Sequence, residues 1–285
     1  TGTGNELNNI VYGTNNNNTM VGLGGNDQLK GRSGNDILLG GDGNDRLYGG
    51  VGRDHMEGGK GNDMFVVSEL GDTVVELAGE GKDRVKSSID YTLGENIEVL
   101  HLEGDAEVGI GNGLNNVLYG TGNKNTLKGL DGNDKLYAKG GDDKLMGGAG
   151  KDTLTGGAGN DLYEFGRGDG YDTINNFSDI ADETDQLLLG ADIAKEDLWF
   201  SRNGDDLMIE LSGSNDRVTV DDWYVDEVYQ VDEIKVGSDI LYKNEVDSLV
   251  SAMASFGNPA AGDMVIPEAT KNDLTSSLAA AWQVG

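Results

Sequence analysis

Several residue types are scarce or missing in this 285-residue chain, and each absence excludes a class of structure or chemistry. There is no Cys, which excludes disulfides and thiolate-bound metals. With His55 and His101 as the only imidazoles, zinc or copper centres and histidine-based acid–base catalysis lack their usual groups. The two Pro exclude collagen-like and Pro-rich segments, and the lack of any run of about 18 apolar residues predicts no membrane span.

Positive charge is also scarce, since 21 Lys and Arg stand against 51 Asp and Glu, for a net charge of −30. Such a polyanion does not bind nucleic acid, and it gains nothing from anionic lipid headgroups. Apolar residues make up 36% of the chain and aromatic residues 6%, which is little for ordinary hydrophobic cores at this length. We therefore expect an additional stabilising agent.

Glycine is abundant, at 47 residues, and it recurs with a period of nine. A first array runs from Gly22 to Val66 and a second from Gly129 to Glu164. The sixth position of each repeat is Asp and the eighth is apolar or aromatic. The nine aspartates are Asp27, Asp36, Asp45, Asp54, Asp63, Asp134, Asp143, Asp152 and Asp161.

Weaker copies precede both arrays and carry Asn at the sixth position, namely Asn9, Asn18, Asn116 and Asn125. Residues 4–14 resemble residues 111–121, which indicates that a larger unit of repeats plus linker was duplicated.

The positions within a repeat have a simple physical meaning. Glycines at positions one to four allow a turn with positive φ and expose backbone carbonyl groups. The short stretch after the Asp predicts a brief strand with one inward apolar side chain, so a repeat buries nothing alone and must stack into a solenoid. Two repeats make one coil, which brings the carboxylates of alternate repeats close together. These carboxylates repel one another unless a hard divalent cation with oxygen ligands lies between them.

This array resembles the GGxGxDxUx repeat of the RTX, or haemolysin-type calcium-binding, family. The resemblance implies a parallel β-roll that binds about five or more Ca²⁺ ions, each between repeats n and n+2. It implies the aspartate pairs Asp27/Asp45, Asp36/Asp54, Asp45/Asp63, Asp134/Asp152 and Asp143/Asp161. The Asn-bearing repeats depart from the pattern and predict weak sites or purely structural turns.

Backbone carbonyl groups of positions one to four are the remaining ligands that the resemblance implies. They belong to Gly31, Ser33, Gly40, Gly41, Asp42, Gly43, Gly49, Gly50, Val51, Gly52, Gly147, Gly148, Ala149 and Gly150. The alternative is a metal-free solenoid in which Asp only favours turns. Turn chemistry alone does not require Asp at position six of every strong repeat.

We predict an all-β fold: a parallel β-roll, or calcium-binding solenoid, in two blocks, followed by a β-rich capping domain and short terminal helices. Alternating residues in the linker predict short strands that carry the β stack from one roll to the next. The predicted segments are roll 1 (1–66), linker (67–110), roll 2 (111–172), capping domain (173–242) and helical tail (243–285).

Two features follow the second array. Asp169 and Asp172 either close the last calcium turn or lie in a solvated loop. The tetrapeptide 202–205, Arg-Asn-Gly-Asp, predicts a hairpin. Aromatic residues cluster nearby, and they favour either a cap over the open end of the roll or, as the alternative, a carbohydrate-binding platform: Trp199, Phe200, Trp223, Tyr224 and Tyr229. Residues 165–256 resemble the flanking domain of secreted RTX toxins.

The tail contains two amphipathic helical patterns, one over residues 246–253 and one over 274–282, the second with Asn272-Asp273 as a cap. The final residues resemble the uncleaved C-terminal signals that this family uses for type I secretion. The alternative interpretation is a packed terminal helix.

These observations predict a calcium-binding module, disordered at low calcium and folded on calcium binding outside the cell, in a secreted bacterial toxin or adhesin. The expected partners are calcium, the type I secretion machinery and a host-cell or glycan ligand, with a monomeric chain. The chain begins at Thr1 without Met, so we expect a fragment. No HExxH or GxSxG motif occurs, so we predict no enzyme here and place any catalytic domain outside the fragment.

Overall fold

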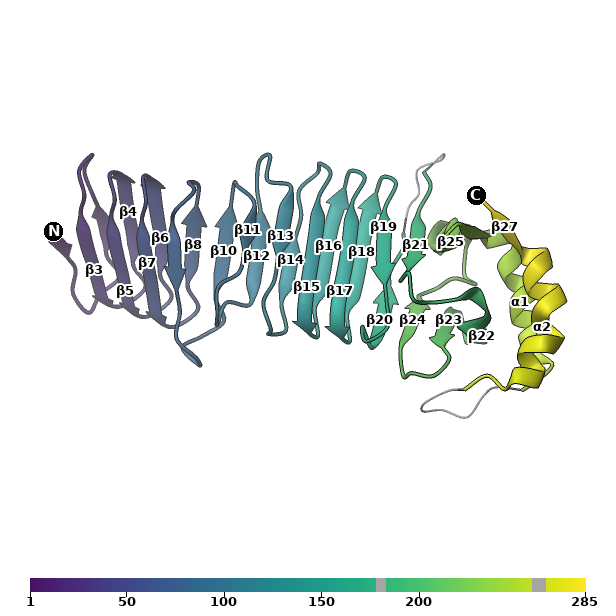
Figure 1. Cartoon of the computed structure of the whole chain (residues 1–285). Helices are drawn as coiled ribbons and strands as arrows, with labels where there is room; N and C mark the ends of the chain where they lie inside the picture. The colour runs from purple at the N-terminus through teal and green to yellow at the C-terminus, as the bar shows by residue number, and fades with distance from the viewer. Residues whose placement is uncertain (178–182, 258–264) are drawn as a thin grey trace. The chain divides into compact units, whose positions relative to one another are not determined.

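The computed structural model of the chain describes residues 1–177, 183–257 and 265–285. These residues form two compact units, Thr1–Thr121 and Gly122–Gly285, and Figure 1 shows the strands of both. Each unit contains parallel strands stacked in two sheets, as the all-β prediction requires.

In the first unit, β1, β3, β5, β7 and β9 form one sheet, while the even-numbered strands from β2 to β14 form another, and β11 pairs with β13. Its strands are β1 (Gly2–Thr3), β2 (Ile10–Tyr12), β3 (Thr19–Gly24), β4 (Gln28–Ser33), β5 (Ile37–Asp42), β6 (Arg46–Val51), β7 (His55–Lys60), β8 (Met64–Val67), β9 (Thr73–Val75), β10 (Arg84–Ser87), β11 (Tyr91–Thr92), β12 (Val99–Leu102), β13 (Val108–Ile110) and β14 (Val117–Tyr119).

The second unit repeats this arrangement and adds antiparallel strands and helices. One sheet has the order β16-β18-β20-β24-β23-β22, and the other β15-β17-β19-β21-β25-β26-β27. Its strands are β15 (Thr126–Gly132), β16 (Lys135–Gly140), β17 (Lys144–Gly150), β18 (Thr153–Ala158), β19 (Leu162–Phe165), β20 (Tyr171–Ile174), β21 (Gln186–Leu189), β22 (Leu198–Asn203), β23 (Asp206–Leu211), β24 (Arg217–Val220), β25 (Glu233–Val236), β26 (Asp239–Tyr242) and β27 (Trp282–Val284).

The register confirms that two repeats make one coil. Leu29 lies opposite Leu47, and Leu38 lies opposite Met56. The apolar side chains of position eight therefore stack directly on one another. They form a narrow core in which Leu29, Leu38, Leu47, Met56 and Phe65 are all 0% exposed.

The strands are longer than the sequence predicted. The three residues after each Asp were expected to form a brief strand, yet β4 (Gln28–Ser33) has six residues. The strand continues through the first three positions of the next repeat, where Arg32 lies opposite Gly50. The glycines of the turn thus also pair within the sheet, because their missing side chains let neighbouring backbones approach closely.

A neutral ladder of asparagine side chains runs along the repeats at position five. The Asn44 N–H donates to Asn26 Oδ1 at 2.8 Å, and the Asn62 N–H donates to Asn44 Oδ1 at 2.6 Å. The recurring Asn at position five is therefore explained by a backbone hydrogen bond to the coil that follows.

The end of the second roll changes from parallel to antiparallel pairing. β24 and β25 each pair in parallel with a strand of the roll, and each then continues into an antiparallel ribbon. The predicted hairpin is confirmed, since Asn203 lies opposite Asp206 at the turn between β22 and β23. Two 3₁₀ turns, Lys195–Asp197 and Glu227–Tyr229, connect these strands.

Two helices pack in this region, α1 (Lys243–Ala254) and α2 (Glu268–Ala281). Both apolar patterns are buried, for example through Leu249 and Leu278. The expected cap at Asn272-Asp273 is wrong, because α2 already begins at Glu268, directly after a proline. Among the described residues, neither α-helix is long and apolar enough to cross a membrane.

Position two of each Asp-bearing repeat has left-handed backbone geometry even where it is not glycine. Leu23 has φ of 82°, Arg32 of 79° and Leu130 of 84°. In this region a side chain costs roughly 1–2 kcal/mol. The described position-two residues of the Asn-bearing repeats lie outside that region: Asn5, Thr14, Asn112 and Thr121. The two kinds of repeat therefore have different turns.

This difference predicts opposite effects of glycine at position two. Leu23→Gly relieves the strained φ and loses little burial, because Leu23 is 43% exposed. After the entropic cost of glycine, we expect the free energy of unfolding to rise by about 0.5–1 kcal/mol at fixed calcium. Chemical denaturation measures this change. Thr14→Gly is the matched control and should lower stability; equal losses in both variants would contradict the prediction.

Candidate metal centre

The repeat aspartates form a continuous ladder of hydrogen bonds between alternate repeats. The backbone N–H of Asp27 donates to Asp45 Oδ1 at 2.7 Å, and the N–H of Asp45 donates to Asp63 Oδ1 at 2.6 Å. The second roll has the same bonds, for example from Asp134 to Asp152 at 2.7 Å. The structure thus brings together the aspartate pairs that the sequence predicted.

The second carboxylate oxygen of each repeat aspartate is buried and has no hydrogen-bond partner within the described part of the chain. This holds for Oδ2 of all nine, and their side chains are at most 2% exposed. A buried acceptor without a partner costs about 1–3 kcal/mol, and more when it is charged. The array therefore contains a regular series of anionic oxygens that no protein group satisfies.

In several repeats a backbone oxygen lies close to this carboxylate oxygen, at the place where the first glycine of the repeat lacks a side chain. A Cβ added to Gly22 would collide with Asp27 Oδ2 and with the carbonyl oxygen of Gly40. The same arrangement is found at Gly31, where an added Cβ would collide with Asp36 Oδ2 and the carbonyl oxygen of Gly49. In the second roll it occurs at Gly129 with Asp134 Oδ2 and the carbonyl oxygen of Gly147. Position one is glycine in these three repeats because the oxygens occupy the place of a side chain, whereas the repeat that holds Asp143 has Ala138 at position one.

The other carbonyl positions that the resemblance implied lie elsewhere in the stacked turns. Position-two and position-four glycines contact the carbonyl groups of the coil before them, as Gly41 contacts Leu23 and Gly43 contacts Gly25. The same stacking holds at Gly50, Gly52, Gly148 and Gly150. At position three, side chains point outward: Asp42 pairs with Lys60 at 3.2 Å, Val51 is 60% exposed, and Ser33 and Ala149 are not buried.

Some predicted oxygens already accept hydrogen bonds from the protein. The Val51 carbonyl accepts from the Gly34 N–H at 2.9 Å, and the Gly50 carbonyl accepts from Ser68 Oγ at 3.1 Å. The Gly31 carbonyl lies beside Asn18 Oδ1 rather than beside an aspartate. The position-one oxygens of Gly40, Gly49 and Gly147 are thus the ones that meet unpartnered carboxylates.

The Asn-bearing repeats satisfy their own side chains. Asn9 Oδ1 accepts from the Asn5 N–H at 2.7 Å, and Asn116 Oδ1 accepts from the Asn112 N–H at 2.7 Å. Asn18 bonds in the same way to Thr14. Because position two is not left-handed in these repeats, its N–H can point to the side chain of position six. These turns are stable without a cation.

Burial raises the pKa of most of the repeat carboxyl groups above the ordinary value of 3.8. The pKa of Asp45 rises to about 6, that of Asp63 to about 7 and that of Asp161 to about 8. Desolvation by burial is the main cause, and the neighbouring carboxylates of the ladder add to it. A cation with oxygen ligands would reverse both effects.

The ladder extends beyond the nonapeptide arrays, where sequence analysis offered Asp172 as one alternative but missed Asp72, Asp83 and Asp185. The Asp54 N–H donates to Asp72 Oδ1 at 3.0 Å, and the Asp63 N–H donates to Asp83 Oδ1 at 2.8 Å. In the second unit, Asp172 and Asp185 accept the corresponding bonds at 3.0 and 2.9 Å. Each of these residues keeps the local order of Asp, any residue, then a residue with an aliphatic side chain. That signal persists where the nine-residue spacing is lost.

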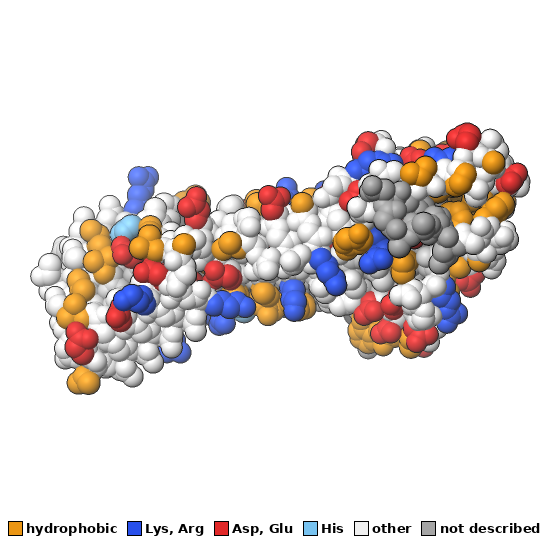
Figure 2. Space-filling model, turned by 90° about the horizontal axis from the view of Figure 1, so that it is seen from below, with side chains coloured by type: hydrophobic (Ala, Val, Ile, Leu, Met, Phe, Trp, Pro, Cys, Tyr) orange, Lys and Arg blue, Asp and Glu red, His pale blue; other side chains and the backbone are white. Residues whose placement is uncertain are grey.

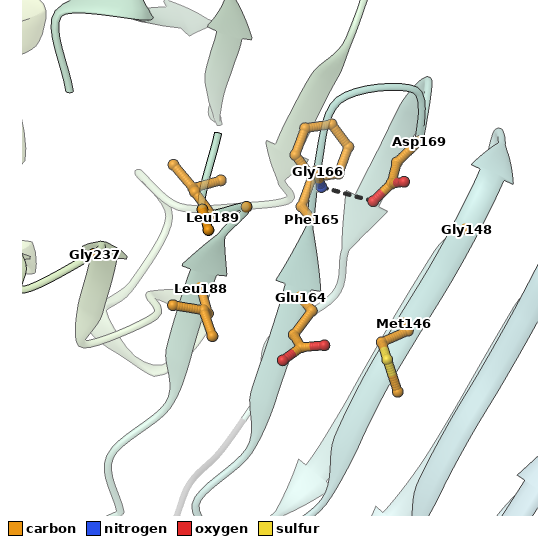
Figure 3. A pocket seen from close by; sticks show the side chains of 11 residues that line it. Met146, Gly148, Glu164, Phe165, Gly166, Asp169, Leu188, Leu189 and Gly237 are labelled. Atoms are coloured by element: carbon orange, nitrogen blue, oxygen red, sulfur yellow. Dashed lines mark hydrogen bonds between the residues drawn. The ribbon is translucent and has the colours of Figure 1, made fainter. Parts of the chain in front are cut away.

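Asp172 belongs to the ladder and Asp169 does not, although sequence analysis left both residues with the same two alternatives. Asp172 is 2% exposed and has an unpartnered Oδ2 like the repeat aspartates. Asp169 lies in a loop, where its Oδ2 accepts from the Gly166 N–H at 2.7 Å, as drawn in Figure 3. This loop borders a pocket of about 480 Å³ whose wall includes Phe165, Leu188 and Leu189.

The aromatic residues of the capping region do not form an exposed platform. Trp199 is 2% exposed, Trp223 is 1% exposed and Phe200 is fully buried, so all three belong to the core. Tyr224 packs against the Arg202 guanidinium at 4.1 Å. The prediction that these residues stack on a carbohydrate is wrong for the tryptophans, because flat sugar rings need an accessible aromatic face.

Surface charge does not follow the aspartate ladder. On the face drawn in Figure 2, acidic side chains lie in scattered patches among backbone and small polar side chains. The repeat carboxylates are hidden because they point into the stacked turns. The whole donor set is oxygen, as hard cations such as Ca²⁺ prefer.

Asp45→Asn tests the unpartnered oxygen while keeping an acceptor for the Asp27 N–H. Without calcium the variant should be more stable than the wild type, because it removes a buried charge; with saturating calcium it should be less stable. Circular dichroism of the folded fraction in EGTA and urea denaturation in calcium measure the two effects. Asp42→Asn is the control, since Asp42 is exposed; the same response from both variants would contradict the assignment.

The raised pKa values predict a pH dependence of the metal-free protein. A folded state with raised carboxyl pKa values binds more protons than the unfolded state, so its stability is greatest at low pH and is lost as pH rises through about 6–8. In EGTA, the folded fraction should therefore increase from about pH 8 to about pH 5. Circular dichroism without denaturant measures this fraction, and a decrease over this range would refute the prediction.

Comparison with known proteins agrees with this geometry. The RTX calcium-binding nonapeptide repeat family matches residues 3–38, 30–65, 110–145 and 137–172. The haemolysin-type calcium binding protein related domain matches residues 206–235, so the two families together cover more than half of the chain. Among solved structures, the extracellular lipase LipA from Serratia marcescens is similar at 20% identity, with a TM-score of 0.31.

That similarity covers 74% of this chain and 37% of the lipase chain, so this chain spans well under half of the lipase. The repeat aspartates, their register and the two family matches lead to one conclusion. The chain belongs to the RTX, or haemolysin-type, calcium-binding family.

Proposed function

We propose that this chain is a calcium-dependent folding module of a secreted protein. The observation that carries the proposal is the series of buried Oδ2 atoms without a partner. Burying so many carboxylates side by side is unfavourable, and cation binding removes the penalty only in the stacked state. Binding free energy is then folding free energy.

The ligands that we propose are the carboxylate pairs and the position-one carbonyl groups that face them. In each pair, Oδ1 of the later aspartate accepts a hydrogen bond from the backbone N–H of the earlier one. This bond fixes the orientation of the later carboxylate. About five ions correspond to the pairs within the arrays, and the additional ladder residues such as Asp172 raise the number.

The proposed mechanism is a disorder-to-order transition outside the cell. Low calcium leaves the Gly-rich chain unfolded and able to pass through an export channel of the type I machinery. Extracellular calcium of about 10⁻⁴–10⁻³ M then folds it. Folding at the exit also opposes backsliding by mass action. We place the export signal in the C-terminal tail, where α2 and β27 pack in the folded state.

We assign no catalysis to this segment, and we place any catalytic or receptor-binding activity of the parent protein outside it. A toxin or an adhesin fits this organisation. We propose a monomer, with calcium as the ligand on which folding depends.

Circular dichroism during a calcium titration tests the proposal. The chain should be largely unfolded in EGTA and gain β structure cooperatively as calcium approaches about 10⁻⁴–10⁻³ M. Magnesium at the same concentration is the control and should induce less structure, because Mg²⁺ sheds its water reluctantly. An equally β-rich spectrum in EGTA and in calcium would refute calcium-dependent folding.

A further inference from the structure

Glu76 stands at the end of the first nonapeptide array, in a segment without the nine-residue repeat. Strand β7 pairs with β9, so that Glu57 lies opposite Val75. Glu76 is therefore stacked on Gly58, the position-one glycine of the last repeat. The Gly58 N–H donates to Glu76 Oε1 at 3.1 Å.

The Glu76 carboxylate takes the place of a backbone carbonyl. One coil earlier, the carbonyl oxygen of Gly58 and Asp45 Oδ2 both lie where a Cβ on Gly40 would be. At Gly58 itself, the corresponding place is occupied by Asp63 Oδ2 and Glu76 Oε1. The backbone carbonyl of Glu76 is engaged elsewhere, because it accepts from Asn96 Nδ2 at 2.9 Å. A charged oxygen has thus replaced a neutral one.

Three carboxylates meet at this point. Ligand oxygens of Asp63, Glu76 and Asp83 lie within 4.8 Å of one another, and the side chains are 2%, 5% and 1% exposed. Asp63 Oδ2 and Glu76 Oε2 are buried and have no hydrogen-bond partner. No Lys, Arg or His of the described residues forms an ion pair with any of the three. Three buried carboxylates without a counter-charge are unfavourable together, and a bound cation is what allows all three to stay ionised.

We propose that Asp63, Glu76 and Asp83 form a calcium site that closes the first roll and carries one more carboxylate than the sites within the array. The proposal rests on calcium binding by the repeats, and it adds a site of higher charge. Affinity of an oxygen site for Ca²⁺ rises with the number of charged ligands. This site therefore fills before the aspartate pairs.

The second roll ends in a different way, which supports the assignment. Over Gly156, Asp161 Oδ2 meets the Tyr163 hydroxyl instead of a carboxylate. That hydroxyl accepts from the Gly156 N–H at 3.0 Å and donates to Asn176 Oδ1 at 2.9 Å. A neutral group closes this roll, so the additional charge at Glu76 is particular to the first.

Glu76→Gln in the full chain tests the site, because it removes the charge and keeps an acceptor for the Gly58 N–H. Native mass spectrometry counts bound ions, and calorimetry gives the affinity of the tightest site. The variant should bind one ion fewer at limiting calcium, and its tightest site should weaken about tenfold or more. In EGTA its folded fraction should be larger than that of the wild type. Glu95→Gln, an exposed change of equal charge in the same segment, should leave all three unchanged.

An unchanged ion count and an unchanged tightest affinity in Glu76→Gln would overturn the closing site. If the variant is unfolded at millimolar calcium, refolding at about tenfold higher calcium supports the site, and failure to refold overturns it. A wild-type chain that binds no calcium at all would instead refute the proposed function itself. Asp83→Asn should reproduce the effect of Glu76→Gln, because it removes a second charge from the same cluster.

Discussion

The aspartate at position six of each Asp-bearing repeat uses its two carboxylate oxygens differently, and most of the structure depends on this difference. Oδ1 accepts a backbone N–H from the coil before, which fixes the parallel register at 18 residues. Oδ2 is buried without a partner, and at Gly22, Gly31 and Gly40 it meets a carbonyl oxygen where a side chain would otherwise lie. The first oxygen makes the stack specific, and the second makes it depend on a cation.

Asn and Asp at position six are therefore not interchangeable forms of one turn. The Asn side chain closes a hydrogen bond within its own repeat and needs no left-handed residue at position two. The Asp-bearing turn accepts that strained residue, even when it is Leu23 or Leu130, and directs Oδ2 toward the next coil. The energy for this strain must come from an interaction that the turn makes only when it is folded, and cation binding is the one that its oxygens allow.

The nine-residue period predicted the solenoid, its core residues and the aspartate pairs, because one hydrogen-bond register and one apolar position repeat in every coil. It did not predict Asp83 or Asp185, since loops of other lengths separate them from the arrays. Asp72 keeps the spacing, 18 residues after Asp54, but its segment lacks the glycines of positions one to four. Composition alone left Trp199 and Trp223 either in a cap or on a carbohydrate platform, and the antiparallel strands and helices of the second unit bury both. Aromatic composition says nothing about burial until the partner elements are placed. In the same way, a search for aspartates at position six could not find Glu76, whose carboxylate replaces a backbone oxygen.

The ladder tolerates insertions of any length, provided that Asp returns at the right place before a strand. The backbone N–H of Asp161 donates to Asp185 across 24 residues, and that of Asp185 donates to Asp232 across 47 residues. Asp232 directly precedes β25, which leads into the antiparallel ribbon of β26 and β27. The charged ladder thus passes from the second roll into the capping strands without interruption. Since Asp185 accepts from the roll and donates to Asp232, which pairs with Lys243 at 2.8 Å, we expect the cap of this unit to fold together with the roll.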